Sequence, residues 1–169
     1  MIKDSGNRTE FEMNGVKTGA VRDIQEGKGR CDLLPLEVVD LVITEEEHKL
    51  HRPIEHIYNF TETGEIIYLS YALGWFAKSR GWDMPTLFLE TSIHFEEGSK
   101  KYGVDNWKKG LSARNYVNSM VRHYLKWARG DNDESHDRAF CWNVICCMWT
   151  CLHKPELNEY RKEENNVKD

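Results

Sequence analysis

Residues 112–130, SARNYVNSMVRHYLKWARG, repeat apolar side chains at steps of three and four, which is the period of one face of an α-helix. Ser112 stands where a helix N-cap is expected, and Gly130 stands where a helix ends. The opposite face is polar and mostly cationic, and it carries Asn115, Ser119, Arg122, Lys126 and Arg129. The stretch therefore predicts an amphipathic helix with one buried face and one basic face.

Start and stop signals for further helices lie on both sides of this stretch. Asp83, followed by Pro85, predicts the first turn of a helix that stops at Gly103. Another helix is predicted over 136–152 and is closed by Pro155. Helical periodicity also marks three earlier segments, which are residues 36–43, the stretch after Pro53 and residues 65–79.

These elements predict a mainly α fold, a compact bundle of about six helices with little or no sheet. Residues 1–18 are polar and predict a flexible N-terminus, and residues 156–169 predict a flexible tail. Between them, residues 19–155 are expected to form a single helical domain, which opens with a Gly-rich N-terminal loop.

The composition disfavours several classes of function. A chain of 169 residues with a formal charge of −5 has no general attraction for a polyanion, so bulk nucleic acid is not an expected partner. No segment offers the ~18 uninterrupted apolar residues of a membrane span, and residues 1–12 lack the apolar core of a signal peptide. The five cysteines form no CxxC pair and indicate reduced core residues. We therefore expect a soluble, cytoplasmic protein.

Basic, amide and aromatic side chains that suit a phosphorylated aromatic ligand gather in the second half of the chain. Arg122 offers a planar fork for phosphate, and the adjacent His123 adds a titratable donor, although a lone histidine is more often structural. Tyr102 and Trp107 are stacking surfaces for a base, although such rings are more often core anchors. Asn143, within an apolar run, is either a tie between helices or a ligand contact.

A Gly-rich segment near the N-terminus is the other candidate for phosphate contacts. Residues 19–30 are basic in their second half, but they lack the spacing of a Walker P-loop. A plain surface loop would explain this segment equally well. A solvated surface would likewise explain Lys126 without any ligand.

Carboxylates on two predicted helices form a candidate site for a divalent cation. Glu96 and Glu97 lie toward the end of one helix, and Glu134 and Asp137 lie at the start of another. Oxygen ligands that face each other across a bundle suit a magnesium ion that bridges phosphates. For Glu97 the alternative is a solvated side chain that pairs with Lys101 four residues on.

The motifs of the chain also occur in a characteristic order. They are Gly19-Ala20-Val21-Arg22-Asp23, Gly27-Lys28-Gly29-Arg30 with Asp32-Leu33-Leu34-Pro35, His94 to Gly103, Asn106-Trp107 with Gly110, and the block from Ser119 to Asn143. In this order they resemble the N-terminal domain family of phage and prophage dATP/dGTP diphosphohydrolases. Shorter members of that family lack a counterpart of residues 37–90, which therefore look like an inserted helical region that lids the pocket or builds an oligomer interface.

The resemblance implies an activity. The family's name implies hydrolysis of a purine deoxynucleoside triphosphate to the monophosphate and pyrophosphate, with Mg²⁺ or Mn²⁺ as cofactor. The all-α pyrophosphohydrolases of the MazG type hold such ions with an EExxE and an ExxD element. Glu134-x-x-Asp137 matches the second element, whereas Gly98-Ser99-Lys100 after Glu96-Glu97 leaves the first incomplete.

The same resemblance implies roles for individual residues. The implied catalytic residues are Glu96, Glu97 and Asp137, and the implied metal ligands are Glu96, Glu97, Glu134 and Asp137. The implied nucleotide-binding residues are Arg22, Lys28, Arg30, Lys101, Tyr102, Asn106, Trp107, Arg122, His123, Lys126 and Asn143.

Two other functions stay open on the sequence alone. A phage protein with many cations but few carboxylates fits a sponge that sequesters a nucleotide immune signal, such as a cyclic dinucleotide or a cyclic ADP-ribose isomer, without a metal. The polar cluster also fits a structural prophage protein whose side chains only tie helices together. For a nucleotide-binding protein we expect a small-molecule nucleotide as partner, a homodimer or larger homo-oligomer, and the cytoplasm of a bacterial host as location.

Overall fold

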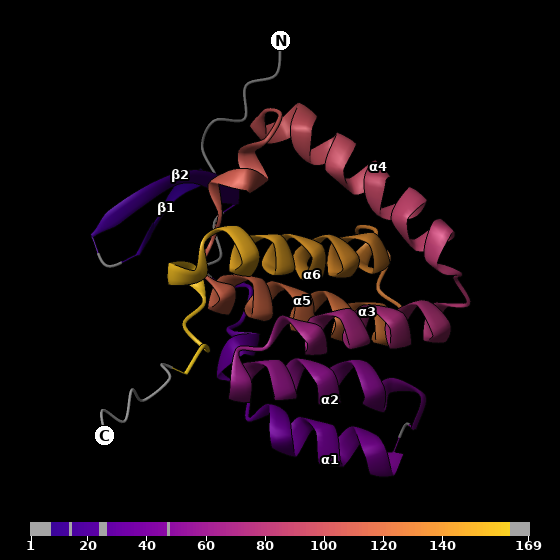
Figure 1. Ribbon diagram of the computed structural model, residues 1–169. Helices are drawn as coiled ribbons and strands as arrows, with labels where there is room; N and C mark the ends of the chain where they lie inside the picture. Colours follow the sequence, from indigo (N-terminus) through magenta and orange to yellow (C-terminus); the bar gives the residue numbers. More distant parts are fainter. Residues whose placement is uncertain (1–7, 14, 24–26, 47, 163–169) are drawn as a thin grey trace, which may run out of the picture.

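The computed structural model describes residues 8–13, 15–23, 27–46 and 48–162 of the chain. Within this part, six α-helices surround one apolar core and a two-stranded hairpin lies at its edge (Figure 1). The helices are α1 (Leu36–Glu46), α2 (His48–Thr63), α3 (Ile66–Arg80), α4 (Met84–Tyr102), α5 (Ala113–Arg129) and α6 (His136–His153), and the strands are β1 (Arg8–Met13) and β2 (Val16–Asp23). Short 3₁₀ turns are η1 (Cys31–Leu33), η2 (Asn106–Lys109) and η3 (Pro155–Leu157). The predicted mainly α bundle is confirmed.

The helix boundaries follow from the capping residues in the sequence. The Asp83 side chain accepts a hydrogen bond of 2.8 Å from the Thr86 backbone N–H at the start of α4. The Ser112 hydroxyl accepts one of 3.3 Å from the third residue of α5. Gly130 ends α5 with φ of 86°, a left-handed conformation that glycine adopts without a steric cost. These predicted helix ends are therefore confirmed.

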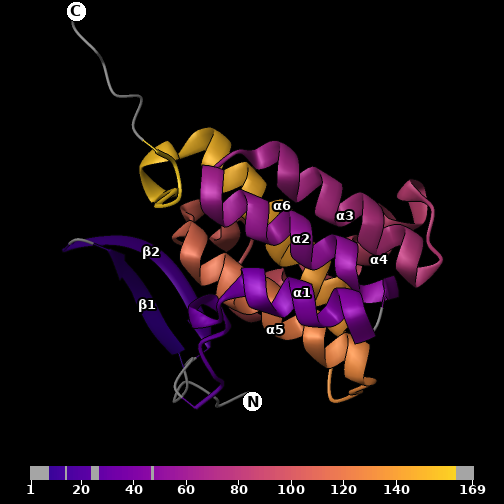
Figure 2. The ribbon, with the colours of Figure 1, turned by 90° about the horizontal axis from the view of Figure 1, so that it is seen from below.

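The core lies where α5 and α6 pack against each other. Figures 1 and 2 show α1, α2 and α3 as a layer on one side of this pair, while α4 crosses α6 on the other side. Phe76 of α3 links the layers, because its ring centroid lies 4.5 Å from that of Phe140 and 6.1 Å from that of Tyr124. In the described part of the chain, no helix combines the length and the apolar composition that a membrane crossing requires.

The hairpin is a correction to the sequence prediction, because residues 8–23 were expected to be a flexible terminus followed by a Gly-rich loop. β1 and β2 pair antiparallel, with an irregularity between Glu10 and Glu12. Ala20 is 2 % exposed against the core, so burial holds the strand in place. The missed signal is Asn14-Gly15 between two runs of alternating character, which is a strong hairpin motif.

The predicted flexible tail is wrong for residues 156–162. Leu157 is 5 % exposed, and Tyr160 packs edge-on against Phe60 with ring centroids 5.5 Å apart. The Asn158 amide donates a hydrogen bond of 2.9 Å to the Gly64 carbonyl. Two packed side chains and one amide therefore hold this segment against the bundle, and residues 163–169 lie outside the described part of the chain.

Candidate functional site

A cavity of about 780 Å³ lies between the hairpin, the C-terminal half of α4, η2, α5 and the start of α6. None of its described lining residues comes from residues 37–90, so the cavity gives no support to the alternative in which this region lids the pocket, and the oligomer interface stays a prediction. Instead, side chains of α2 and α3, such as Phe60 and Phe76, belong to the core. Predicted site residues that line the cavity are Arg22, Lys28, Glu97, Lys101, Tyr102, Asn106, Trp107, Arg122, His123, Lys126, Glu134 and Asn143.

Three predicted site residues lie elsewhere. Arg30 is exposed and donates from Nε to the Asp32 carboxylate over 2.7 Å. Glu96 is exposed and pairs with Lys100, because it lies about 100° round α4 from its neighbour Glu97, which does line the cavity. Asp137 pairs with Arg80 of α3 over 3.0 Å on a different surface.

The four carboxylates predicted as metal ligands are therefore not brought together. Glu96 and Asp137 are absent from the cavity wall, whereas Glu97 and Glu134 line it. A magnesium site with all four side chains does not fit this arrangement. The structure corrects the sequence prediction on this point.

Two arginines meet at one hydroxyl in the cavity wall. Arg22 of β2 donates from Nη2 to Ser119 Oγ over 2.7 Å, and Arg122 donates to the same oxygen over 3.3 Å. Arg22 Nε and Nη1 are buried and have no acceptor, and Arg22 forms no ion pair among the described residues. Burial and the nearby charge of Arg122 lower the pKa of Arg22 to about 10. An anion in the cavity would offset this concentration of positive charge.

Two of the three lysines that line the cavity already have carboxylate partners. Lys101 pairs with Asp23 over 2.7 Å, and Lys126 pairs with Asp133 over 2.9 Å. Burial opposes ionisation of Asp23, but hydrogen bonds from Lys101 and Tyr102 hold its pKa below the usual value. The lysines are therefore balanced, whereas Arg22 is not.

The two predicted amide contacts differ in their availability. Asn106 Oδ1 accepts from the Val21 N–H over 3.2 Å, and its Nδ2 donates to the Val21 carbonyl over 3.0 Å. Asn106 thus fixes β2 to η2, and its predicted role at the base has no support in this geometry. Asn143 Nδ2 donates to the Ala139 carbonyl of its own helix over 2.8 Å, while its buried Oδ1 has no donor among the described residues.

Trp107 is a core anchor that also lies in the cavity wall. Its ring packs edge-on against Phe95 and Trp149, with centroids 5.4 Å and 5.1 Å away, so it anchors η2 to α4 and α6. It also lines the cavity. Further aromatic side chains that line the cavity were not among the predicted site residues, and these are Phe95, Tyr116 and Trp142.

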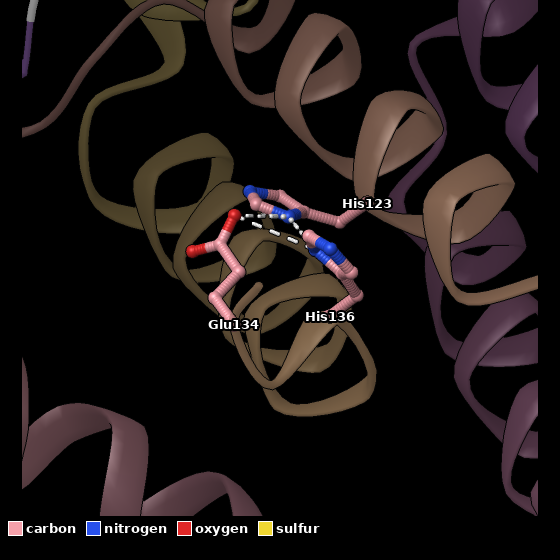
Figure 3. A group of neighbouring side chains, drawn as sticks. All are labelled: His123, Glu134 and His136. Carbon is pink, nitrogen blue, oxygen red and sulfur yellow. Dashed lines mark hydrogen bonds and ion pairs between the residues drawn. The ribbon is translucent and has the colours of Figure 1, made fainter. Parts of the chain in front are cut away.

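A second group of side chains stands at the edge of the cavity where α5 meets the start of α6. Figure 3 shows His123, Glu134 and His136 pointing toward one another. The two Nδ1 atoms are 3.1 Å apart, and Glu134 Oε1 lies 3.5 Å from His123 Nδ1 and 3.4 Å from His136 Nδ1. Burial and the charge of Arg122 lower the pKa of His123 to about 3, so its ring is neutral near pH 7.

His136 was not among the predicted site residues, and it shares a helical stripe with Phe140 and Cys147. It is 2 % exposed. The available signal was the Glu134-x-His136 spacing at a helix start, next to a helix that carries another histidine.

A cavity lined by arginines, lysines and aromatic rings is typical of proteins that bind phosphorylated aromatic molecules. The family model of the N-terminal domain of dATP/dGTP diphosphohydrolases matches residues 77–160, and through this segment the chain belongs to that family, as its motifs predicted. The family's name supports a nucleotide-handling, hydrolase role. Comparison with curated proteins and with solved structures gave no match. The motifs of residues 19–35 lie outside the matched segment, so their resemblance stays a prediction.

Proposed function

We propose that the cavity binds a purine deoxynucleoside triphosphate and that the protein hydrolyses it to the monophosphate and pyrophosphate. The observation that carries the proposal is the pair of arginines around Ser119, which concentrates positive charge without a carboxylate partner for Arg22. A guanidinium pair of this kind suits phosphate oxygens better than any neutral ligand. The dATP/dGTP diphosphohydrolase family supports the choice of nucleotide.

The size and the lining of the cavity agree with this ligand. Its volume of about 780 Å³ falls within the range of about 300–1,000 Å³ that small-molecule sites occupy. The phosphates belong at the Arg22 and Arg122 end, where Lys126 adds a further cation. The base belongs against the aromatic lining, where Trp142 lies next to the unpaired acceptor of Asn143. That acceptor suits an exocyclic amine of a purine.

Hydrolysis also requires a group that accepts a proton from the attacking water. Asp23 and Asp133 are engaged in ion pairs, and Glu134 contacts two histidines. Glu97 lines the cavity, and its Oε2 lies 3.8 Å from His94 Nδ1. We therefore assign the proton acceptor to Glu97, while the arginines stabilise the charge that develops on the phosphoryl oxygens.

A second candidate function follows from the placement of the carboxylates. Because Glu96 and Asp137 lie outside the cavity, the site holds more cations than acidic groups suited to catalysis. The same cavity would then sequester a phosphorylated nucleotide, such as a cyclic dinucleotide, without converting it. This alternative shares the arginine pair and differs only in the fate of the ligand.

One experiment separates the two functions. The protein is incubated with deoxynucleoside triphosphates, ribonucleoside triphosphates and cyclic dinucleotides, with either a divalent metal or EDTA, then denatured, and the released nucleotides are separated by chromatography. Release of monophosphate and pyrophosphate from dATP or dGTP supports the hydrolase. Recovery of an unchanged cyclic nucleotide only after denaturation supports sequestration, and neither outcome with any ligand contradicts both.

Matched variants test the residues. Arg122→Met should weaken binding of any phosphorylated ligand, because it removes one of the two guanidinium groups at Ser119. Arg129→Met is the control, since Arg129 lies on the same helix, is exposed and pairs with Asp131. Glu97→Gln should abolish turnover and preserve binding if the hydrolase assignment is correct. An Arg122→Met protein that binds and turns over as the wild type does would contradict the phosphate site.

A further inference from the structure

The cluster at the edge of the cavity has the dimensions of a metal coordination sphere. Metal bonds to imidazole nitrogen and carboxylate oxygen are about 2.0–2.2 Å long, so neighbouring ligand atoms are separated by about 3.0 Å in octahedral and 3.4 Å in tetrahedral sites. The three ligand atoms of His123, Glu134 and His136 are separated by 3.1, 3.4 and 3.5 Å. They already stand at the spacing that one ion would impose (Figure 3).

With both rings neutral, these three atoms have one hydrogen to share among their contacts. His136 Nε2 lies 2.8 Å from Asp133 Oδ1, and a carboxylate only accepts, so Nε2 carries the ring hydrogen. His136 Nδ1 then presents a lone pair, as does Glu134 Oε1. His123 Nδ1 can supply one hydrogen to one of them and leaves the other lone pair unmatched. A cation in the middle would satisfy all three atoms at once.

The surroundings of the cluster match those of metal-bound histidines. A ligating histidine usually donates its other ring N–H to a carboxylate, which fixes the orientation of the ring. Asp133 does this for His136, and Lys126 in turn holds Asp133 over 2.9 Å. Two imidazoles with one carboxylate suit a first-row transition metal better than Mg²⁺, which prefers oxygen ligands and water.

We propose that His123 Nδ1, His136 Nδ1 and Glu134 Oε1 bind one divalent transition-metal ion, such as Zn²⁺ or Co²⁺, at the edge of the cavity. Asp133 acts as a positioning residue for His136. Since His123 and Glu134 also line the cavity, an ion held by them would lie within reach of a phosphate bound there. Only this last step, contact between the ion and a phosphate oxygen, rests on the proposed nucleotide function. The metal site itself does not.

Titration with Co²⁺ tests the site directly and without any nucleotide. The protein is stripped with EDTA, dialysed and titrated with Co²⁺, and binding is followed by visible absorption and by metal content after gel filtration. The wild type should bind one Co²⁺ per chain. His123→Gln and Glu134→Gln should each weaken binding by more than ~100-fold, and Asp133→Asn should weaken it by ~10- to 100-fold. His153→Gln is the control, because His153 is exposed at the far end of α6.

The outcomes divide clearly. Loss of Co²⁺ in both the His123 and the Glu134 variant, with circular dichroism unchanged, supports the site. The proposal is overturned if the wild type does not bind one Co²⁺ per chain. It is also overturned if both variants bind Co²⁺ as tightly as the wild type does. Asp131, Asp133 and His136 form an alternative ligand group, so loss of the metal in Asp131→Asn but not in Glu134→Gln would also overturn it. A nucleotide assay that fails in EDTA and in metal contradicts the proposed function but leaves the Co²⁺ titration intact.

Discussion

Replacement of Arg22 by methionine should make the folded protein more stable and should remove its response to phosphate-containing anions. Burial and Arg122 lower the pKa of Arg22 to about 10. At about 1.4 kcal/mol per pKa unit, the fall from the usual value means that the charge costs the folded state about 3 kcal/mol. The site therefore holds a destabilising charge that a bound anion would compensate.

The net effect of the substitution is smaller than this electrostatic cost. Methionine removes the hydrogen bond from Arg22 to Ser119, which is worth about 1 kcal/mol, but Ser119 Oγ still accepts from Arg122. Methionine also retains most of the aliphatic stem and leaves little empty volume. We expect a gain in unfolding free energy of about 2 kcal/mol, or a rise in Tm of roughly 4–8 °C for a chain of this size.

Urea and thermal unfolding with and without pyrophosphate measure both parts of this prediction. Pyrophosphate should raise the Tm of the wild type and leave that of Arg22→Met nearly unchanged. Arg30→Met is the control, since Arg30 is exposed and lies outside the cavity, and its stability should stay within about 0.5 kcal/mol of the wild type. A variant that is less stable by more than about 1 kcal/mol, or that keeps the full response to pyrophosphate, would refute the reasoning.

Four further predictions concern the fold and the assembly. Gly64→Ala should destabilise the protein by more than ~1 kcal/mol in urea unfolding, because Gly64 has φ of 72° and a Cβ would stand 2.5 Å from a backbone atom of the C-terminal segment. Gly74→Ala, in a helix with open space around it, should be neutral or stabilising, and equal losses in both would contradict the packing. Asn106→Ala should speed hydrogen exchange in β2, which it anchors, and unchanged exchange would show that other contacts hold the strand. Burial lowers the pKa of His94, so the unfolded chain binds a proton more readily than the folded protein, and stability should fall as the pH drops below about 6.5. His94→Gln should make this fall shallower when urea midpoints are measured across pH. An identical slope would show that His94 does not cause the pH dependence. Leu89 is 70 % exposed on α4. If the expected homo-oligomer forms through this face, Leu89→Glu should lower the mass measured by light scattering and leave the Tm unchanged. An unaltered mass would exclude this face as the interface.

The helices could be predicted because their signals are local. Ser112 and Gly130 cap α5 within a turn of their own positions, and the apolar steps between them fix which face is buried. The cationic residues near Arg122 could be placed for the same reason, since three- and four-residue steps determine a helix face. For Arg22 the sequence offered only a basic loop, and its place in the cavity depends on a strand that pairs and packs far from its neighbours in sequence.

The wrong predictions have a different physical origin. In each case the side chain or segment interacts with a residue that is far away in the sequence. Asp137 has the spacing of a metal ligand, but Arg80 of α3 takes its carboxylate. Asn106 has the chemistry to contact a base, but the Val21 peptide occupies both ends of its amide. The Gly64 carbonyl likewise holds a tail that composition alone predicts to be loose. Spacing in one helix could not reveal any of these competing partners.

The geometry of α5 explains how one helix can serve two different chemistries. Arg122 and His123 are consecutive, so their side chains leave the helix about 100° apart. One reaches Ser119 beside Arg22, and the other reaches Glu134 and His136 across the start of α6. A phosphate held by the two guanidinium groups would therefore lie beside the cluster of His123, Glu134 and His136. The Arg122 charge helps to lower the pKa of His123, which keeps its ring nitrogen free to act as a ligand. The Arg122 charge that attracts a phosphate thus also disfavours a proton on the His123 ring, and a bound phosphate would offset the same repulsion toward a cation at the cluster.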